Sequence, residues 1–289
     1  LVERLHQEYR VTVFDKKYFS RKNILPFADK IDIIEGDFQN CDDWLDLVPQ
    51  ADYLIHLAWS TLPANINAVY DIESNVVPTV KLLDVLKETR HAQLIFISSG
   101  GTVYGKKERS PISECEGTSP ICSYGLTKLM VEKHLYLYNH LYGVDYRIAR
   151  LSNPYGERQG NIKTQGLITT GLVHLINSKP MVVWGDGTVV RDYIHIRDVV
   201  ECIARMLPYS GPERVFNVSS AVGCSVNDII DTISRVTGKK LETHYEKGRK
   251  FDIKENILSN VLAKNELGWQ PTVKLEDGIL SLYNYLLKS

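Results

Sequence analysis

Short apolar runs recur along the first half of the chain, and polar segments separate them. The runs cover residues 11–15, 31–36, 53–58, 94–98 and 146–151. Between them, residues 71–88 and 124–142 carry apolar side chains at helical spacing. Alternation of buried strands with helices is typical of βα units around a parallel sheet that is covered on both faces. The pattern therefore predicts a doubly wound α/β domain over residues 1–152.

The pattern changes after Leu151, where the polar, glycine-containing segment NPYGERQGNIKTQG follows. Further on, the sequence predicts a helix over 167–177, a strand at MVVWG, and a strand followed by a helix within RDYIHIRDVVECIARML. Ser225 and Gly238 are suitable cap residues for a helix between them, and the tail LEDGILSLYNYLLKS is amphipathic. We predict a smaller α/β domain over 153–185 and 209–289, with 186–208 returning to the first domain.

The composition limits the kinds of molecule that the protein is expected to bind. The 289 residues are 44% hydrophobic and 24% charged, with a formal net charge of -1, so no overall field attracts nucleic acid or an acidic membrane. No apolar run reaches the roughly 18 to 20 residues that span a bilayer, and no signal peptide is visible. The five cysteines form no CxxC pair and the eight histidines no HExxH. These features predict a cytoplasmic protein without disulfides or metal, whose partners are small molecules or copies of itself.

The chain begins with LVERLHQEYRVTVFD, which reads as a helix, a strand and then an acidic residue. In dinucleotide-binding folds this order follows a first strand and a glycine-rich turn, with the acid about 20 residues beyond the turn. By that spacing, the turn would fall before residue 1. We expect impaired dinucleotide binding by a chain without it, because backbone N–H groups at such a turn hold the pyrophosphate.

The segment SYGLTK places Tyr124 and Lys128 on one face of a predicted helix that follows the strand LIFISS. Ligands of open α/β sheets bind at the carboxyl ends of the strands. An adjacent ammonium would lower the pKa of the phenol, so that Tyr124 exchanges a proton with a sugar hydroxyl near neutral pH. Spacing alone leaves a second interpretation open, in which the two residues are a pair on the helix surface.

Several motifs stand in a fixed order along the chain: VTVFD, EGDFQN, LIHLAW, SNVVPTVKLLDVL, IFISSGGTVYG, SYGLTK, RLSNPYG and WGDGTVVRDYIHIRDV. In these motifs the chain resembles, over essentially its whole length, the extended short-chain dehydrogenase/reductase family, and within it the nucleotide-sugar epimerases similar to UDP-galactose 4-epimerase. The resemblance implies a Rossmann-type sheet that binds NAD, with a C-terminal domain that binds the nucleotide sugar. It also implies that the family's N-terminal glycine-rich strand-turn segment is absent from the sequence.

The same resemblance implies which residues bind NAD. Asp15 would bind the adenosine ribose, which favours NAD because a carboxylate repels the additional phosphate of NADP, although Lys16 and Lys17 weaken that preference. The other candidates, in chain order, are Asp37, Phe38, Leu57, Ala58, Asn75, Ser98, Tyr124, Lys128 and Leu151. Phe38, Leu57 and Ala58 also fit ordinary core positions.

One departure from the family lies in SSGGTVYG, where Gly100 replaces the Ser or Thr that bonds the reacting oxygen of the substrate. Ser99 and Thr102 are the nearby hydroxyls, and Thr102 is our preferred replacement. Gly101 and Thr102 stand where sugar 4,6-dehydratases similar to this family carry an Asp-Glu pair. Without those carboxylates the elimination of water lacks its acid and base, which argues against a dehydratase.

In the second half, the resemblance implies a site for the nucleotide sugar. Arg191 and Arg249 match two arginines that bind the diphosphate, a role suited to the planar fork of the guanidinium. The further candidates are Asn153, Val182, Trp184 and Asp252, together with Asn256 near the C2 substituent of the sugar. Arg191 also fits an ion pair with Asp192, Arg249 a solvated run of charges, and Trp184 a core position.

The resemblance predicts an enzyme that inverts C4 of a UDP-hexose through a transient 4-keto sugar. Tyr124 would take the proton of the C4 hydroxyl, while Lys128 would bond the nicotinamide ribose. An NDP-sugar 4-ketoreductase or dehydrogenase with net redox change is the alternative, and a non-catalytic nucleotide-sugar binder is a third. Residues 71–88 and 124–142 resemble the helix pair of a four-helix dimer interface, so we expect a homodimer. The motifs leave open which sugar is bound and whether the base is uracil or thymine.

Overall fold

The computed structural model describes residues 1–89, 91–159, 166–248 and 253–288. The chain divides into two compact units. Unit 1 consists of Leu1–Gly105, Gly117–Arg150 and Ile203–Phe216, and unit 2 of Lys106–Glu116, Leu151–Cys202 and Asn217–Ser289. That unit 1 binds the dinucleotide and unit 2 the nucleotide sugar stays a prediction.

Unit 1 contains two sheets. The strands are β1 (Val11–Asp15), β2 (Ile31–Glu35), β3 (Tyr53–His56), β4 (Gln93–Ser99), β5 (Tyr146–Leu151) and β9 (Val215–Val218). Strands β1 and β2 pair in parallel as a two-stranded sheet, and the second sheet has the order β3-β4-β5-β9 with β3 parallel to β4. Short 3₁₀ turns separate β1, β2 and β3. The five strands predicted in the first half of the sequence are therefore confirmed.

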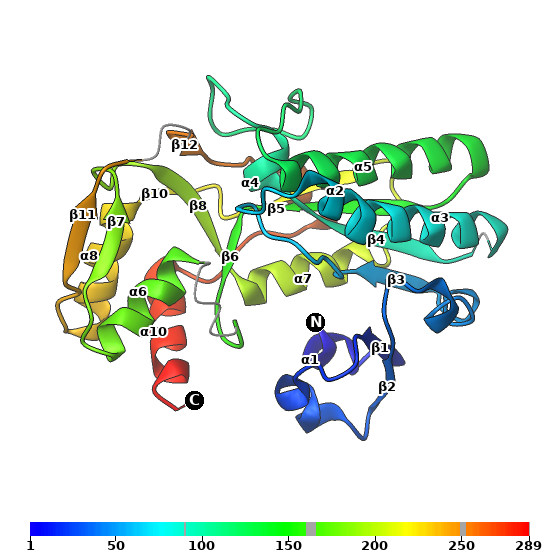
Figure 1. Cartoon of the computed structure of the whole chain (residues 1–289), viewed down its shortest axis with the longest axis horizontal. Helices are drawn as coiled ribbons and strands as arrows, with labels where there is room; N and C mark the ends of the chain where they lie inside the picture. Colours follow the sequence, from blue (N-terminus) through cyan, green and yellow to red (C-terminus); the bar gives the residue numbers. More distant parts are fainter. Residues whose placement is uncertain (90, 160–165, 249–252, 289) are drawn as a thin grey trace. The chain divides into compact units, whose positions relative to one another are not determined.

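The helices of unit 1 are α1 (Val2–Leu5), α2 (Ala68–Asp71), the π-helix η5 (Ile72–Val76), α3 (Val77–Thr89), α4 (Gly100–Val103) and α5 (Ser123–Tyr142). Helix α7 (Ile196–Met206) has residues 196–202 in unit 2 and 203–206 in unit 1. Helices α3 and α5 lie side by side along the sheet (Figure 1). The helical segment predicted over 71–88 is confirmed, and residues 72–76 within it form a π-helix. In that π-helix Ser74 Oγ donates to the carbonyl of Tyr70 at 2.6 Å, a back-bond that competes with the regular helical pattern.

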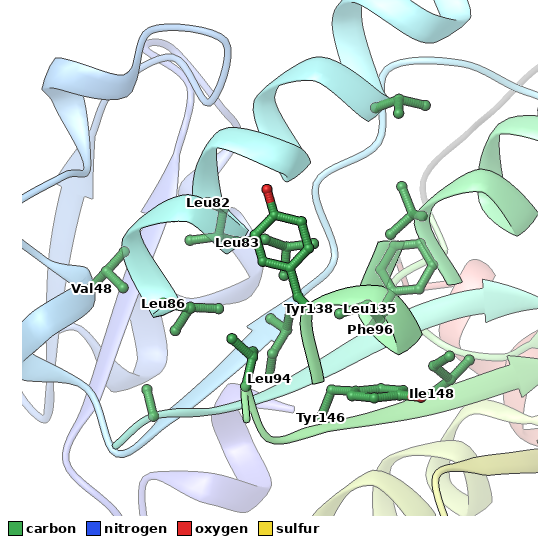
Figure 2. Close-up of a cluster of buried hydrophobic side chains, with 14 of the residues drawn as sticks. Val48, Leu82, Leu83, Leu86, Leu94, Phe96, Leu135, Tyr138, Tyr146 and Ile148 are labelled. Carbon is green, nitrogen blue, oxygen red and sulfur yellow. The ribbon is translucent and has the colours of Figure 1, made fainter. Parts of the chain in front are cut away.

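The core of unit 1 lies between the two long helices and the sheet. Leu82, Leu83 and Leu86 project from α3, and they face Leu135 and Tyr138 of α5 (Figure 2). From the sheet, Leu94 and Phe96 of β4 and Tyr146 and Ile148 of β5 complete the cluster. Burial of these side chains is what fixes α5 on β4, and α5 carries the Tyr–Lys pair of the predicted site.

Unit 2 contains the strands β6 (Asn153–Tyr155), β7 (Met181–Trp184), β8 (Val190–His195), β10 (Gly223–Ser225), β11 (Thr243–Glu246) and β12 (Glu255–Asn256). Strand β8 pairs with β10, β12 and β6, while β7 pairs in parallel with β11. The helices are α6 (Leu167–Ile176), α8 (Val226–Thr237), α9 (Val261–Leu267) and α10 (Leu275–Leu286).

The predicted caps of α8 are confirmed. Ser225 Oγ accepts from the N–H of Asp228, whose carboxylate accepts in return from the N–H of Ser225, so the two form a capping box. Gly238 ends the helix in the left-handed conformation. Helices α6, α8 and α10 pack on one another around a second buried cluster that includes Leu172, Ile233 and Leu282. Among the described residues, no helix combines the length and apolar character that crossing a bilayer requires.

Candidate active site

Tyr124 and Lys128 lie on the first two turns of α5, at the carboxyl end of β4. The helix is capped by Cys122, whose Sγ accepts from the N–H of Gly125 at 3.4 Å. Lys128 is 4% exposed, and its Nζ donates to the carbonyl of Ile97 at 2.7 Å. Sequence spacing therefore located the pair correctly on one helix face, and the alternative of a solvent-exposed surface pair is wrong for Lys128.

The head group of Lys128 lies among three aromatic rings. Its Nζ is 3.6 Å from the centroid of the Trp59 ring, 4.8 Å from that of Phe96 and 5.8 Å from that of Tyr124. We call these three side chains the aromatic cage. Trp59 and Tyr124 also meet edge to face, with centroids 6.1 Å apart. The cage was not predicted, although Trp59 stands in the motif LIHLAW.

Burial controls the protonation of both residues of the pair. It raises the pKa of Tyr124 to about 12, with a smaller contribution from Cys122. It also lowers the pKa of Lys128 well below the ordinary value, and Glu132 opposes this shift only in part. The expectation that the ammonium lowers the pKa of the phenol is therefore wrong for this structure, because desolvation outweighs a charge that is itself disfavoured by burial.

A buried polar network supports this end of the sheet. Glu132, one turn after Lys128 on α5, accepts from Ser98 Oγ at 2.5 Å and from Nε and Nη2 of Arg150, the latter at 2.5 Å. Arg150 also donates to the hydroxyl of Tyr104 at 2.9 Å. The network joins α5, β4 and β5. It engages the hydroxyl of Ser98, which was predicted to bind the cofactor.

The hydroxyls proposed to replace the one missing at Gly100 lie on either side of it. Ser99 is the residue before α4, and its side chain makes no capping hydrogen bond. Thr102 Oγ1 donates to the carbonyl of Ser99 at 3.4 Å. Thr102 also touches α5 at Gly125, where an added Cβ would lie 2.9 Å from the Thr102 carbonyl oxygen. Thr102 is thus held next to the residue that follows Tyr124, and its role stays a prediction.

Two predicted cofactor residues follow the parallel strands β1 and β2. Asp15 ends β1, is exposed, and accepts from the N–H of Lys16 through Oδ1 at 2.8 Å. Asp37 is exposed and caps its own turn by accepting from the N–H of Gln39 at 2.9 Å. Phe38 is half-buried, and its ring contacts Trp44 and His56. Phe38 therefore packs in the core as well as bordering the strand ends.

The loop after β3 holds the next candidates. Leu57 and Ala58 are exposed, so the alternative of plain core positions is wrong for both. Asn75 is buried in the π-helix and fastens this loop, since its Oδ1 accepts from the N–H of Ser60 at 2.7 Å. Its Nδ2 donates to Thr61 Oγ1 at 3.3 Å. The amide of Asn75 thus holds the loop after β3 in place, and a role of this loop in cofactor binding stays a prediction.

In unit 2, three of the predicted substrate residues gather on β8 and its neighbours. Arg191 lies in β8, and its Nη1 donates to the carbonyls of Val190 and Ile253 at 2.8 and 2.7 Å. Asn153 in β6 donates through Nδ2 to the carbonyl of Asp192 at 2.8 Å. Asn256 in β12 is buried and stands opposite Arg191 in the strand register.

Asp192 itself is fully buried and accepts from Ser220 Oγ and from the N–H groups of Ser220 and Ala221. Burial raises the pKa of this carboxyl despite these bonds. The carboxylate organises the turn 219–222 beside Arg191.

The remaining candidates lie elsewhere. Val182 and Trp184 point from the exposed side of β7 and are 42% and 46% exposed, so a core position for Trp184 is wrong. Leu151 ends β5. Arg249 and Asp252 lie outside the described residues.

A parallel α/β sheet with acidic residues after β1 and β2 and a Tyr–Lys pair at the end of β4 defines a nucleotide-dependent enzyme of the dehydrogenase type. The sequence profile described as NAD dependent epimerase/dehydratase family matches residues 1–219, and the chain belongs to that family.

Known relatives agree with this assignment. The chain is 32% identical to a UDP-glucose 4-epimerase of Corynebacterium glutamicum over 92% of its length and 85% of the relative. It is 37% identical to a dTDP-4-dehydro-6-deoxyglucose reductase of Escherichia coli over 78% of its length and 72% of the relative. Among solved structures, a UDP-glucose 4-epimerase of Thermotoga maritima with UDP-glucose superimposes with a TM-score of 0.92, 28% identity and coverage of 99% and 94%.

NAD is the cofactor of this family, and the described residues fit it. Asp15 leaves its side chain exposed at the end of β1, as ribose binding requires. The exposed residues Leu57 and Ala58 follow β3, and Trp59 Nε1 is buried there without a hydrogen-bond partner in the described part of the chain. An orphaned donor beside Lys128 is consistent with a polar ligand at this strand end.

Proposed function

We propose that this protein is an NAD-dependent epimerase that inverts C4 of a UDP-hexose. The observation that carries the proposal is the Tyr124–Lys128 pair, which α5 holds at the carboxyl end of β4 in a chain of the NAD-dependent epimerase/dehydratase family. When bound, NAD supplies the hydride acceptor and donor at C4 of the sugar. The chain's own residues supply binding, orientation and the proton.

On the cofactor side, Asp15 binds the adenosine ribose, Asp37 and Phe38 border the adenine, and the loop at Leu57 and Ala58 lies along the pyrophosphate. Lys128 donates to the nicotinamide ribose. Each of these groups follows the carboxyl end of a strand, where ligands bind in open α/β sheets.

On the substrate side, Tyr124 exchanges a proton with O4 of the sugar. Its pKa of about 12 keeps the phenol protonated at neutral pH, so removal of the O4 proton requires a lowered pKa in the working enzyme. An approach of the Lys128 ammonium to the phenol would produce this change. Thr102 or Ser99 bonds the reacting oxygen in place of the hydroxyl missing at Gly100.

The diphosphate is bound by Arg191 and Arg249, and the sugar by Asn153. Arg191 lies in a strand and its guanidinium is held by two backbone carbonyls, which limits its rotamers and prepares it for bidentate binding of an anion. Val182 and Trp184 offer exposed apolar surface on β7 for the base, and Asp252 contacts its ribose.

A homodimer in the cytoplasm is part of the proposal. Helices α3 and α5 carry exposed apolar side chains, among them Val77, Leu137 and Leu141, which are 43%, 44% and 55% exposed. Pairing these helices with those of a second copy would bury them in a four-helix arrangement. The five cysteines are all free, which suits a reducing compartment.

The test uses protein expressed from the complete reading frame, incubated with NAD and a panel of UDP-hexoses, and it follows sugar stereochemistry by proton NMR. We expect interconversion of C4 epimers without net change of NADH absorbance. Tyr124→Phe should lower the rate at least about 100-fold, because general acid–base catalysis contributes that much. Tyr136→Phe on the exposed side of the same helix is the matched control and should keep full activity. Equal rates in wild type and Tyr124→Phe would refute the role of the phenol.

A second candidate is an NDP-sugar 4-ketoreductase. The 37% identity to the dTDP-4-dehydro-6-deoxyglucose reductase supports it, and so does a protonated Tyr124, which is ready to donate to a keto oxygen. Stoichiometric oxidation of the reduced cofactor by a 4-keto sugar nucleotide, without epimerisation of UDP-hexoses, would establish this alternative.

A further inference from the structure

The three side chains of the aromatic cage around Lys128 come from a strand, a helix and a loop. Phe96 belongs to β4 and Tyr124 to α5, two elements that the buried core joins. Trp59 belongs to the loop between β3 and α2, and it makes the shortest contact, 3.6 Å from its ring centroid to Nζ. An ammonium over the face of an indole is the most favourable of the cation–π pairs. The loop residue thus makes the closest aromatic contact with the head group, which also donates to the carbonyl of Ile97.

The buried side chains of Asn75 and Asp71 fasten the loop close to Trp59, and Asp71 bonds to Thr61 and Asn65. Asn75 accepts from the N–H of Ser60, the next residue, and donates to Thr61 Oγ1. These hydrogen bonds do not include the indole of Trp59, whose Nε1 is buried and has no hydrogen-bond partner in the described part of the chain. A buried donor without an acceptor destabilises the state that contains it. The covering position of Trp59 therefore carries both a favourable contact and a cost that vanishes when the ring moves.

In this position, Lys128 cannot also donate to a ribose. Lys128 as a whole residue is 4% exposed, its Nζ donates to the carbonyl of Ile97, and the Trp59 ring lies over the amine. An ammonium that binds a ribose diol must present its protons to the ligand. Trp59 is the wall that comes from a loop, and it packs against the core cluster and meets the rings of Phe96 and Tyr124. Freeing the amine therefore requires the Trp59 ring to leave these contacts.

We propose that Trp59 is a positioning residue that covers the Lys128 amine in the free protein and moves aside when the dinucleotide binds. This inference rests on the proposed function, because it takes the ribose of the dinucleotide as the ligand of Lys128. Trp59 acts through Lys128 and does not itself exchange protons with the substrate.

Whether Trp59 covers the Lys128 amine is tested by chemical labelling, which needs neither cofactor nor a measurement of enzyme activity. Full-length protein is treated with a trace of acetic anhydride at constant pH, and the acetylation of each lysine is measured by peptide mass spectrometry. We expect Lys128 to react about tenfold faster in Trp59→Leu than in wild type, as the loss of a cation–π contact and of cover implies. Trp59→Phe keeps an aromatic face and should stay close to wild type. Ile66→Ala, at a position in the same loop that is 97% exposed, is the matched control and should change nothing.

Unchanged acetylation of Lys128 in a folded Trp59→Leu variant would overturn the cover. If that variant fails to fold by circular dichroism, Asn75→Ala replaces it, since release of Ser60 should expose Lys128 in the same way. Unchanged acetylation in the Asn75 variant would overturn the proposal equally.

The movement is tested by adding NAD while following tryptophan emission, with binding measured independently by calorimetry. The difference in emission between wild type and Trp59→Phe should change as NAD saturates the protein. A constant difference at saturating NAD would refute the displacement. If protein expressed from the complete reading frame binds no NAD in calorimetry, the proposed function is refuted, while the acetylation result still decides whether Trp59 covers Lys128.

Discussion

Replacement of Glu132 by alanine should destabilise the protein far more than the loss of an ordinary ion pair. Glu132 and Arg150 are joined at 2.5 Å, and their side chains are 3% and 6% exposed. Burial would lower the pKa of Arg150, but the bonds from Glu132 prevail and raise it. Without Glu132 this support is lost, yet a guanidinium is not deprotonated in proteins, so Arg150 stays charged and loses its ionic partner. Ser98 Oγ would lose its acceptor at the same time.

The magnitude follows from this burial. Breaking one side of a buried pair costs about 3–5 kcal/mol, a large part of the roughly 5–15 kcal/mol that stabilises a folded domain. With a urea dependence of about 2–3 kcal/mol per molar, the unfolding midpoint should fall by about 1–2 M. The midpoint is measured by far-ultraviolet circular dichroism and tryptophan fluorescence on the same samples.

The chain offers a matched control in Arg235 and Glu276, which are joined at 3.2 Å with side chains 62% and 46% exposed. Glu276→Ala should cost less than about 1 kcal/mol, because exposed ion pairs contribute little. The double variant Glu132→Met, Arg150→Met should be more stable than Glu132→Ala, since it leaves no buried charge. A Glu132→Ala variant no less stable than Glu276→Ala would refute the reasoning.

Three further predictions concern pH, packing and assembly. Burial and the nearby Lys128 lower the pKa of His56 to about 3 from 6.5. Between these two pH values the unfolded chain binds more protons than the folded protein. The free energy of unfolding is therefore lost as the pH falls through that window, at about 1.4 kcal/mol per pH unit. Urea midpoints between pH 7 and 5 should accordingly fall more steeply in wild type than in His56→Gln, and parallel slopes would contradict this. Gly125→Ala places a methyl group 2.9 Å from a backbone oxygen of Thr102. Turnover should fall roughly 10- to 100-fold, because the clash displaces Thr102 and the neighbouring Tyr124. A turnover equal to wild type would show that α4 and α5 need not be in contact there. Leu137→Glu should convert a dimer to monomers in sedimentation velocity, and an unchanged species would exclude α5 from the interface.

The elements around the site could be predicted because strong local signals define them. Residues 11–15 and 146–151 are strands with the predicted bounds, and the caps at Ser225 and Gly238 have the predicted conformations. A period of two or of 3.6 residues, or a cap, depends on near neighbours in the sequence. The spacing of Tyr124 and Lys128 is also a local signal, because the two residues are four positions apart on one helix.

What the sequence could not predict depends on contacts between distant segments. The phenol's pKa is decided by burial rather than by the lysine four residues away, and the cage wall at Trp59 comes from 69 residues before Lys128 in the numbering of the chain. Glu132 and Arg150 read as ordinary charged residues until β5 is placed beside α5. The π-turn at 72–76 likewise replaces a helix that periodicity alone would continue.

The pairing of β1 and β2 bears on how the cofactor is held. In the described residues these two five-residue strands pair with each other, separately from the sheet of β3, β4, β5 and β9. The residues of β1 and β2 are at most partly buried, whereas most residues of β4 are buried, so amide hydrogens of β1 and β2 should exchange with solvent ahead of those of β4. Because Asp15 ends β1, a ribose bound there would favour the paired state and slow that exchange. The order of this segment would then vary with the concentration of NAD around the protein.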